Sequence, residues 1–460
     1  MSVLINQIEQ FCEKYKSKRI GIFLHTSVVQ EQSDDLKNLR SYSKLIRFYL
    51  PHDTVSELEL LSKHSNLYYY RIKSRLLLDG RAKRINLTWN HIVEYKTNIC
   101  YLHDCDVALF VFYEPAAAID FNKRMGATKN TYVLSVDLYD IDNNVSLVST
   151  GSSIKRKACK PFNLDFNEYI FGENDVLEVI DKDKSIIDTY SLDDLEEVGF
   201  GGESFLYTYP TKKDTMIKIF WFELSQEMVN KLKLMMQCAE MLVGVTLPDA
   251  LVYHQNRCIG YQMKRAEGVS LRHYLNTSAN SVSLYKDLIR NISVLLLELR
   301  MAQLVVSDLS DGNIFVSKDG KKITIIDADS AEFYCYPGGG ATEPYRHPDL
   351  TIDYFYSKYR LYEYFHFSYS VVVFQILMGY KHPLMQKGLG IEEPEWQKHK
   401  FPLTNSFFSK PKETRGCKVN RDCLTNWKNQ SLSMRKKFVE VFNFKTTPTI
   451  GEWCSTLGIK

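Results

Sequence analysis

Three polar residues in the second half of the chain have the types and spacing of a metal-dependent reaction site. Asn313 follows Asp308 by five residues, and Asp327 follows Asn313 by fourteen. Asn313 stands before the apolar run 314–316, Asp327 stands after the β-branched run 323–326, and a Lys-Asp-Gly turn separates the runs. This pattern predicts a β-hairpin whose open end brings Asn313 and Asp327 together. Carboxylate and amide oxygens there suit Mg²⁺, so we predict both as metal ligands, with Asp308 beside them.

Two other interpretations of these residues stay open. Asp and Asn often flank hairpins because they cap and turn the backbone. The Asp327 and Asp329 pair also matches an Asp-x-Asp motif of nucleotide-sugar transferases, in which both carboxylates approach a metal ion. That interpretation gives no role to Asp308 and Asn313, so the joint spacing favours the first site.

A glycine-rich segment upstream predicts a close approach of backbone to phosphate. Gly199, Gly201 and Gly202 lie between two β-prone segments, and Ser204 stands where a third spaced glycine would complete G-x-G-x-x-G. Glycines have no side chain, so backbone N–H groups can come close to phosphate oxygens. Such a segment is a weak signal by itself.

A single lysine in an apolar strand follows the glycines. Lys218 is the one charged residue of the run 216–220, and its burial is costly without a phosphate or carboxylate partner. The next predicted helix has Glu223 and Glu227 near its start. We predict Glu227 as the partner of Lys218, although either glutamate also suits the positive end of a helix.

With these residues assembled, the chain from about 190 to 460 resembles the protein kinase superfamily. It is most similar to divergent bacterial serine/threonine kinases found with helix-hairpin-helix modules or tellurite-resistance systems. The resemblance rests on motifs in the family's order, namely the glycine loop 199–207, Lys218, the gatekeeper Met263 with the hinge 264–266, the catalytic loop 308–313, Asp327-Ala-Asp329 at the DFG position, the end of an activation segment at 343–349 and a large helix at 368–384.

The resemblance implies ATP and Mg²⁺ as cofactors and gives each motif a role. The implied catalytic residues are Asp308, Lys218 and Asn313, and the implied metal ligands are Asn313 and Asp327. The implied ATP contacts are Gly199, Gly201, Gly202, Ser204, Leu206, Lys218, Glu227, Met263 and Arg265.

Several positions depart from the family pattern. Val306 and Ser307 replace the His-Arg pair before the catalytic aspartate, so a phosphorylated activation segment lacks its usual cationic anchor. Activity independent of such phosphorylation is therefore expected. Ser310 replaces a lysine that contacts the transferred phosphate, Ala328 replaces the DFG phenylalanine, and Phe365 stands at the place of a buried helix aspartate.

The expected fold is α+β. A bilobal kinase-like fold, with a β-rich N-lobe and a helical C-lobe, follows a separate α/β domain of unknown function. The expected boundaries are 1–150 for the first domain, 151–185 for a linker with leading strands, 186–266 for the N-lobe with the hinge, and 267–460 for the C-lobe. The first domain is a candidate for binding a protein partner.

The expected function is phosphoryl transfer from ATP to a protein hydroxyl, with serine or threonine favoured over tyrosine. Two alternatives stay open. One is a nucleotide-binding pseudokinase that acts as a scaffold through its N-terminal domain. The other is a kinase-like transferase that modifies a small molecule or lipid, or that transfers AMP.

Composition limits the partners of the chain. Its 460 residues carry a net charge of +3, which does not favour a nucleic acid partner. No apolar run is long enough to span a bilayer, and ten cysteines without a CxxC pair predict free thiols in a reducing cytosol. We therefore expect a cytoplasmic protein with no membrane partner.

One segment of the first domain has basic residues at alternating positions. Arg71, Lys73 and Arg75 alternate, so on a strand they would share one face, which would meet either phosphate or water. Leu76–Leu78, Asp79-Gly80 and the run through Trp89 predict a tight hairpin after them.

Overall fold

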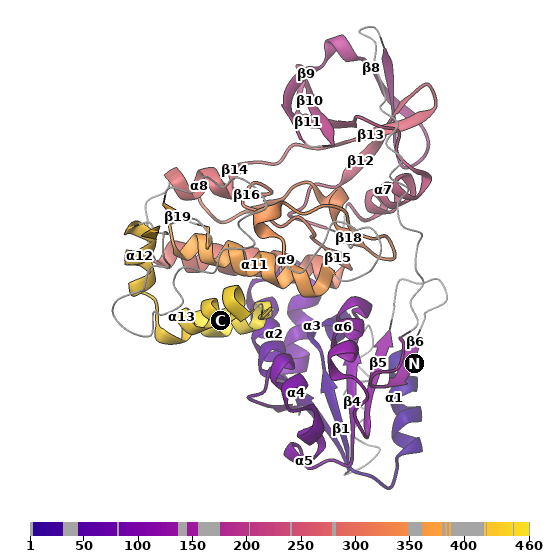
Figure 1. Ribbon diagram of the computed structural model, residues 1–460. Helices are drawn as coiled ribbons and strands as arrows, with labels where there is room; N and C mark the ends of the chain where they lie inside the picture. The colour runs from indigo at the N-terminus through magenta and orange to yellow at the C-terminus, as the bar shows by residue number, and fades with distance from the viewer. Residues whose placement is uncertain are drawn as a thin grey trace.

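The structure is a computed structural model that describes fourteen stretches of the chain. These are residues 3–30, 45–80, 82–136, 145–154, 175–201, 203–239, 242–277, 282–347, 361–379, 382–383, 386–387, 418–419, 421–444 and 446–459. It is a mixed α+β structure with several sheets (Figure 1), which confirms the expected class. Within the described stretches, no helix has the length and apolarity needed to cross a bilayer.

The N-terminal unit, residues 3–154, is built on a six-stranded sheet in the order β3-β2-β1-β4-β5-β6. Its first five strands run parallel and β6 is antiparallel. β1 and β4 are apolar and buried at every position, as strands covered on both faces are. The strands are β1 (Ile20–Leu24), β2 (Ile46–Leu50), β3 (Lys83–Arg84), β4 (Val107–Phe112), β5 (Thr131–Val136) and β6 (Val145–Ser149).

Helices cover both faces of this sheet, so it has a separate apolar core on each side. These helices are α1 (Val3–Lys14), α2 (His52–His64), α3 (Tyr68–Asp79), α4 (Trp89–Glu94), α5 (Ile99–Leu102) and α6 (Pro115–Met125), with the 3₁₀ segments η1 (Thr26–Gln30) and η3 (Lys96–Asn98).

The predicted hairpin after residue 76 is wrong. Leu76–Leu78 end α3, and the short β3 joins β2 in parallel. Leu77 and Leu78 pack on the N-terminal core, so these leucines belong to a helical stripe and not to a strand. On a helix, residues two apart lie about 200° apart and residues four apart lie about 40° apart, so Arg71 and Arg75 share one side of α3 and Lys73 lies on the other.

The sheet unit, residues 175–264, is a seven-stranded antiparallel sheet in the order β8-β7-β12-β13-β11-β10-β9, with α7 (Gln226–Cys238) against it. β7 lies in the range predicted to hold the leading strands. The strands are β7 (Val176–Ile180), β8 (Ile186–Ser191), β9 (Glu196–Phe200), β10 (Ser204–Tyr209), β11 (Lys212–Phe220), β12 (Pro248–His254) and β13 (Arg257–Lys264), and η4 (Leu192–Asp194) follows β8.

The helical unit, residues 265–459, surrounds α9 (Val282–Met301) and α11 (Leu361–Leu377). Its other helices are α8 (Leu271–Thr277), α12 (Arg421–Lys428), α13 (Leu432–Phe444) and α14 (Ile450–Leu457). Short strands form three small sheets, which contain β14 (Val269–Ser270), β16 (Ile314–Val316) and β17 (Ile323–Ile325), then β15 (Leu304–Val305) and β18 (Glu332–Phe333), then β19 (Gln386–Lys387) and β20 (Lys418–Val419). The 3₁₀ segments are η5 (Ala328–Ser330) and η6 (Glu343–Tyr345).

The helical unit lies between the other two units (Figure 1). Its contacts with the N-terminal unit are made by α9 and α14 on α2, and by α11 on α6. The cores interpenetrate, because Met301 of α9 belongs to the N-terminal core while Leu60 and Leu61 of α2 belong to the largest core. The N-terminal unit therefore has its own sheet and cores, and it also packs closely against the helical unit.

The cysteines also depart from the expectation in one place. Seven of the described cysteines are free. Cys335 is disulfide-bonded, so the expectation that all thiols are free does not hold at this position.

Candidate functional site

The predicted hairpin is present and positions the polar residues at its open end. β16 pairs with β17 in antiparallel register, with Ile314 opposite Ile325. Gly320 in the turn has a positive φ of 74°, which suits glycine. The N–H of Ile326 donates to the carbonyl oxygen of Asn313 at 2.9 Å. The backbone of Asn313 therefore lies beside the residue that precedes Asp327.

Asp308 is held in place by two donors. The side-chain amide of Asn313 donates to one carboxylate oxygen of Asp308 at 2.8 Å and to its carbonyl at 3.1 Å. The backbone N–H of Thr342 donates to the other carboxylate oxygen at 2.6 Å. Since the NH₂ group of Asn313 is used here, its amide oxygen remains as the atom for a cation.

Lys218 lies in β11 opposite Tyr261 of β13 and contacts both acids of the Asp-x-Asp pair. Its ammonium group donates to Asp327, and to the two oxygens of Asp329 at 2.9 and 3.1 Å. The Tyr261 hydroxyl also donates to Asp329, at 2.7 Å. Asp327 has φ 63° and ψ 38°, a left-handed conformation that is unfavourable for residues other than glycine.

The charges of this cluster are strongly coupled. Burial and the charge of Asp329 raise the pKa of Asp327 to about 6, and Lys218 opposes that rise. Burial also disfavours ionised Asp329, but Lys218 and the Tyr261 hydrogen bond outweigh it and lower the pKa of Asp329. Burial opposes the Lys218 ammonium, yet Asp329 and Asp327 raise its pKa. Lys218 thus remains charged between two carboxylates.

Helix α7 presents a lysine to this cluster and not the predicted glutamate. Glu227 lies in the first turn, which Ser225 caps by accepting the N–H of Met228. One turn later, the buried Lys231 donates to the carbonyl oxygens of Asp329 at 2.6 Å and of Pro337 at 3.3 Å. Burial lowers the pKa of Lys231 to about 7. The carboxylates bonded to Lys218 are therefore Asp327 and Asp329, not Glu227.

Lys231 was missed at the sequence level, although a signal for it exists. It stands three residues after Met228 and four before Met235, at the spacing of the apolar stripe of α7. A lysine in such a stripe is buried, and therefore needs acceptors. Asp329, which has no role in the site predicted around Asp308 and Asn313, makes two bonds to Lys218 and is therefore central to the cluster.

The glycine segment lies one strand away from Lys218. Leu206 pairs with Gly199 on one side and with Lys218 on the other. The N–H of Gly201 donates to the carbonyl of Ser204 at 2.8 Å and closes a tight turn. Ser204 is buried and opposite Phe220, whereas Gly202 lies outside the described residues.

The predicted gatekeeper and hinge lie at the end of β13. Met263 is buried and opposite Met216 of β11, two positions from Lys218 along the strand. Arg265 has an exposed side chain, and its backbone N–H donates to the carbonyl of Asp214 at 2.8 Å. Met263 thus faces the same strand as Lys218, and the N–H of Arg265 is already engaged.

Residues that depart from the kinase pattern have structural roles here. The Ser307 hydroxyl donates to the carbonyls of Ser330 at 2.5 Å and Gly339 at 3.2 Å. It therefore ties the strand before Asp308 to the segment after Asp329. Val306, Ser310, Ala328 and Phe365 are all buried.

A buried aspartate braces the segment 308–313 that was predicted to be a catalytic loop. Asp311 accepts hydrogen bonds from Arg272 of α8 at 2.9 Å and from Gln375 of α11 at 3.3 Å. Burial and the contact with Asp311 raise the pKa of Tyr345. The Ser368 hydroxyl of α11 donates to the Tyr345 carbonyl at 2.8 Å. The loop is thus tied to α8, to α11 and to the segment around Tyr345.

The oxygen atoms at the hairpin mouth fit a magnesium ion that shares its shell with phosphate. In the described stretches, no group of three or more His, Cys, Asp or Glu side chains is arranged for a metal ion. Asn313 and Asp327 offer one amide oxygen and one carboxylate. Mg²⁺ is commonly held by one or two carboxylates plus substrate phosphates and water, so the types of these two side chains fit the expected ion.

Comparison with known proteins gives no family for this chain, so a function can be argued only from the geometry of the site. No protein-family model matches the chain, and no curated protein matches it significantly. The site is therefore defined by the cluster of Asp308, Asn313, Asp327, Asp329, Lys218 and Lys231.

Proposed function

We propose that this chain is an ATP- and Mg²⁺-dependent phosphotransferase of the protein kinase type. In this proposal the sheet unit is the N-lobe and the helical unit is the C-lobe. The observation that carries it is the Asp308 carboxylate, oriented by Asn313 and by the Thr342 N–H, next to the hairpin mouth that holds Asp327. Lys218 reaches the same mouth from β11.

Each side chain then has a defined task. Asp308 accepts the proton of the acceptor hydroxyl and orients its oxygen, because its carboxylate is fixed before the acceptor arrives. Lys218 binds phosphate oxygens with an ammonium that nearby carboxylates keep charged. Asn313 and Asp327 would hold Mg²⁺, which neutralises charge on the phosphate oxygens when bound. The glycine segment would cover the phosphates.

The acceptor is proposed to be a serine or threonine hydroxyl of a protein. Ser307 supports activity that does not depend on a phosphorylated activation segment. Ser307 ties the segment just before Asp308 to Ser330 and Gly339 by neutral hydrogen bonds. No added phosphate is needed to order that contact.

One observation favours a second candidate, a nucleotide-binding module without transfer. Both acids of the Asp-x-Asp pair already neutralise Lys218, and phosphate has to compete with them for the ammonium. If that competition fails, the chain binds nucleotide weakly or without productive alignment.

The test is phosphoryl transfer from radiolabelled ATP with Asp308→Ala and Asp327→Ala variants. Loss of an oriented catalytic group typically costs on the order of 10²-fold or more in rate, so both variants are expected to fall by at least that factor. Intact-mass analysis of the products distinguishes phosphoryl from adenylyl addition. Unchanged transfer by both variants would overturn the assignment. Nucleotide-dependent thermal stabilisation without transfer by the wild type would establish the second candidate.

A further inference from the structure

The carboxyl edge of the N-terminal sheet is filled by the rest of the chain. Strand order reverses between β1 and β4, and ligands of doubly wound sheets usually bind at this point. Here the segment after β1, Thr26–Gln30, is entirely buried, as is Glu114 after β4. The guanidinium of Arg300, from the last turn of α9, reaches Glu114 at this edge.

Arg300 is buried and paired at this edge. It is 1% exposed, and its guanidinium donates to Glu114 at 3.0 and 3.3 Å. Glu57 of α2 lies 4.0 Å away. A buried arginine is stable only with such partners, so the end of α9 is fixed to α2 and to the segment after β4.

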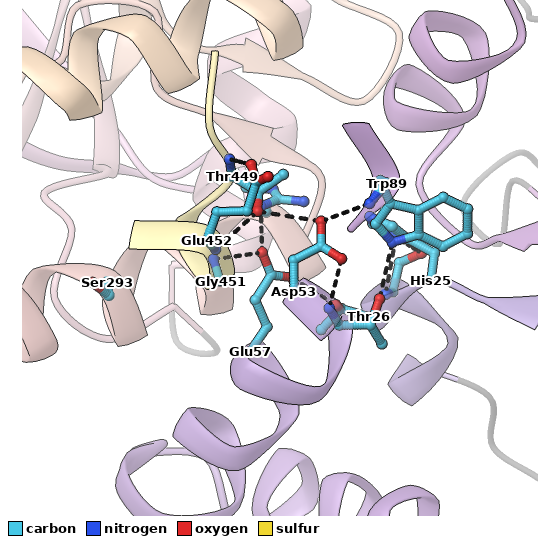
Figure 2. A network of polar contacts seen from close by, with 12 residues as sticks. His25, Thr26, Asp53, Glu57, Trp89, Ser293, Thr449, Gly451 and Glu452 are labelled. Carbon is cyan, nitrogen blue, oxygen red and sulfur yellow. Dashed lines mark hydrogen bonds and ion pairs between the residues drawn. The ribbon is translucent and has the colours of Figure 1, made fainter. Parts of the chain in front are cut away.

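Helix α14 is fixed to the same edge. Figure 2 shows Asp53 and Glu57 of α2 facing the start of α14. Glu57 accepts the N–H of Gly451 at 3.2 Å and the hydroxyl of Thr26 at 2.6 Å. Asp53 accepts the N–H of Trp89 at 3.2 Å and the hydroxyl of Thr449 at 3.4 Å. The Glu57 carboxylate therefore links α2, η1 and α14 beside Arg300.

The anchored end of α9 leads directly into the candidate site. Met301, the next residue, is a member of the N-terminal core. β15 begins at Leu304 and pairs with β18, where Val305 is opposite Glu332. Asp308 comes three residues after Val305, and Asp329 comes three residues before Glu332. Asp308 and Asp329 thus both continue from the end of the β15–β18 ribbon at Val305 and Glu332. The other end of the ribbon, at Leu304, follows the anchored helix α9.

We propose that Arg300 is a positioning residue through which the N-terminal unit holds the β15–β18 ribbon in register. The N-terminal unit then supports the reaction site structurally. Arg300 occupies the edge of its sheet where a doubly wound sheet usually binds a ligand. The catalytic consequence rests on the proposed function, whereas the ordering of the ribbon does not. Breaking the anchor should therefore loosen the ribbon and misplace Asp308, while Lys218 in the sheet unit stays ordered.

The experiment is hydrogen–deuterium exchange on the full chain with Arg300→Met and the control Glu298→Ala. Glu298 also lies on α9 and also joins the N-terminal unit, because it accepts from the Ser65 hydroxyl at 2.7 Å and the Asn66 N–H at 2.6 Å. It has no contact with Glu114 or Glu57 among the described hydrogen bonds. The pair separates general loosening of the interface from loss of the Arg300 anchor.

Arg300→Met is expected to raise exchange in β15 and β18 by about tenfold or more, as for a segment that opens locally, and to leave exchange in β11 unchanged. Glu298→Ala, which removes both hydrogen bonds to Ser65 and Asn66, is expected to leave exchange in β15 and β18 unchanged. Equal effects of the two variants on the ribbon, or no change in the ribbon with Arg300→Met, would overturn the proposal. If Arg300→Met does not fold, Arg300→Lys, which keeps the charge, replaces it with the same expectation at smaller amplitude.

Transfer assays form the second arm. Arg300→Met should lower kcat with little change in the KM for ATP, because Asp308 is displaced and Lys218 is not. If the wild type shows no transfer, the proposed function fails, and the exchange data still decide whether Arg300 positions the ribbon. A rise in the KM for ATP with unchanged kcat would contradict a role in positioning Asp308.

Discussion

The partner of Lys218 comes from the segment after β17 and not from α7. Asp329 bonds to Lys218 through both carboxylate oxygens and is fixed in turn by Tyr261. Lys231 holds the backbone carbonyl of the same residue. The orientation of Lys218 therefore depends on a short segment that also carries Asp327, so the lysine and that acid are positioned together.

Asp329→Asn tests whether Asp329, and not Glu227, is the carboxylate that holds Lys218. With Asn at 329, Asp327 is the remaining carboxylate that bonds to Lys218 among the described residues, so under the proposed function it is less available to hold Mg²⁺. We expect kcat/KM for ATP to fall about 10- to 100-fold, the usual range for a lost charge-assisted contact in a reaction site. The measurement is steady-state transfer at varied ATP, with nucleotide-dependent thermal shift as a second readout.

Glu227→Gln is the matched control. Glu227 lies in the first turn of α7, and its charge acts with burial to raise the pKa of Tyr336. We expect kcat/KM within about twofold of wild type, as for a substitution away from the reacting groups. A larger loss in Glu227→Gln than in Asp329→Asn would restore the glutamate as the partner of Lys218.

At the scale of elements, the position of Lys218 depends on close contact between β11 and β13. Gly260 of β13 is opposite Ile219, and a Cβ added at Gly260 would lie 2.1 Å from the carbonyl oxygen of Lys218. That atom belongs to the backbone, so it cannot move without displacing the strand. A glycine is required here for close approach and not for its φ angle.

Gly260→Ala is therefore expected to lower the free energy of unfolding by about 2 to 3 kcal/mol, the range for an overpacked core. Chemical denaturation followed by fluorescence measures the change. Gly199→Ala is the control, since a Cβ at Gly199 meets nothing within 4 Å. We expect Gly199→Ala to leave stability within about 0.5 kcal/mol of wild type. Equal stability losses in the two variants would contradict this account.

Elements formed by neighbouring residues were predictable from the sequence. The hairpin of β16 and β17 depends on a short turn and two β-branched runs, and all of its pairs are local. The mixed α+β class followed from similar patterns. The hairpin predicted at residues 76–80 is wrong because three consecutive leucines fit a strand and a buried helix end equally well. Only packing on the N-terminal core decides between the two.

Contacts between distant residues were not predictable in the same way. The partner of Lys218 depends on the rotation of α7 and on the path of the chain after β17, which one sequence does not determine. Asn313 and Asp308 lie five residues apart, so their contact was foreseen. Arg300 and Glu114 are far apart in sequence, and nothing near either residue shows what covers it.

At the scale of the whole molecule, several buried carboxyl groups lie between the N-terminal and helical units in the part of the chain that the structure describes. Asp53, Glu57 and Glu114 are all buried, and Arg300 is the cation paired with the last two. Glu452 of α14 lies close enough for its charge to act on Asp53. Burying several carboxylates with one arginine is costly unless some of them hold a proton.

The pKa of Asp53 shows where such a proton is held. Burial, and then the charges of Glu452 and Glu57, raise this pKa well above the usual range. The folded chain therefore keeps this proton to a higher pH than the unfolded chain, which releases it near pH 4. The stabilising contribution of protonated Asp53 is complete below that pH and is lost as the pH rises through the folded-state pKa.

Asp53→Asn should remove this part of the pH dependence. The amide cannot ionise, and its oxygen still accepts the N–H of Trp89. We expect the unfolding midpoint of the variant, relative to wild type, to rise as the pH increases from about 5 to about 8. Thermal unfolding across that range measures the difference, with Asp193→Asn as an exposed control. A constant difference between variant and wild type over this range would show that Asp53 is ionised in the folded chain, and that the contact between the two units balances its charges without a bound proton at this residue.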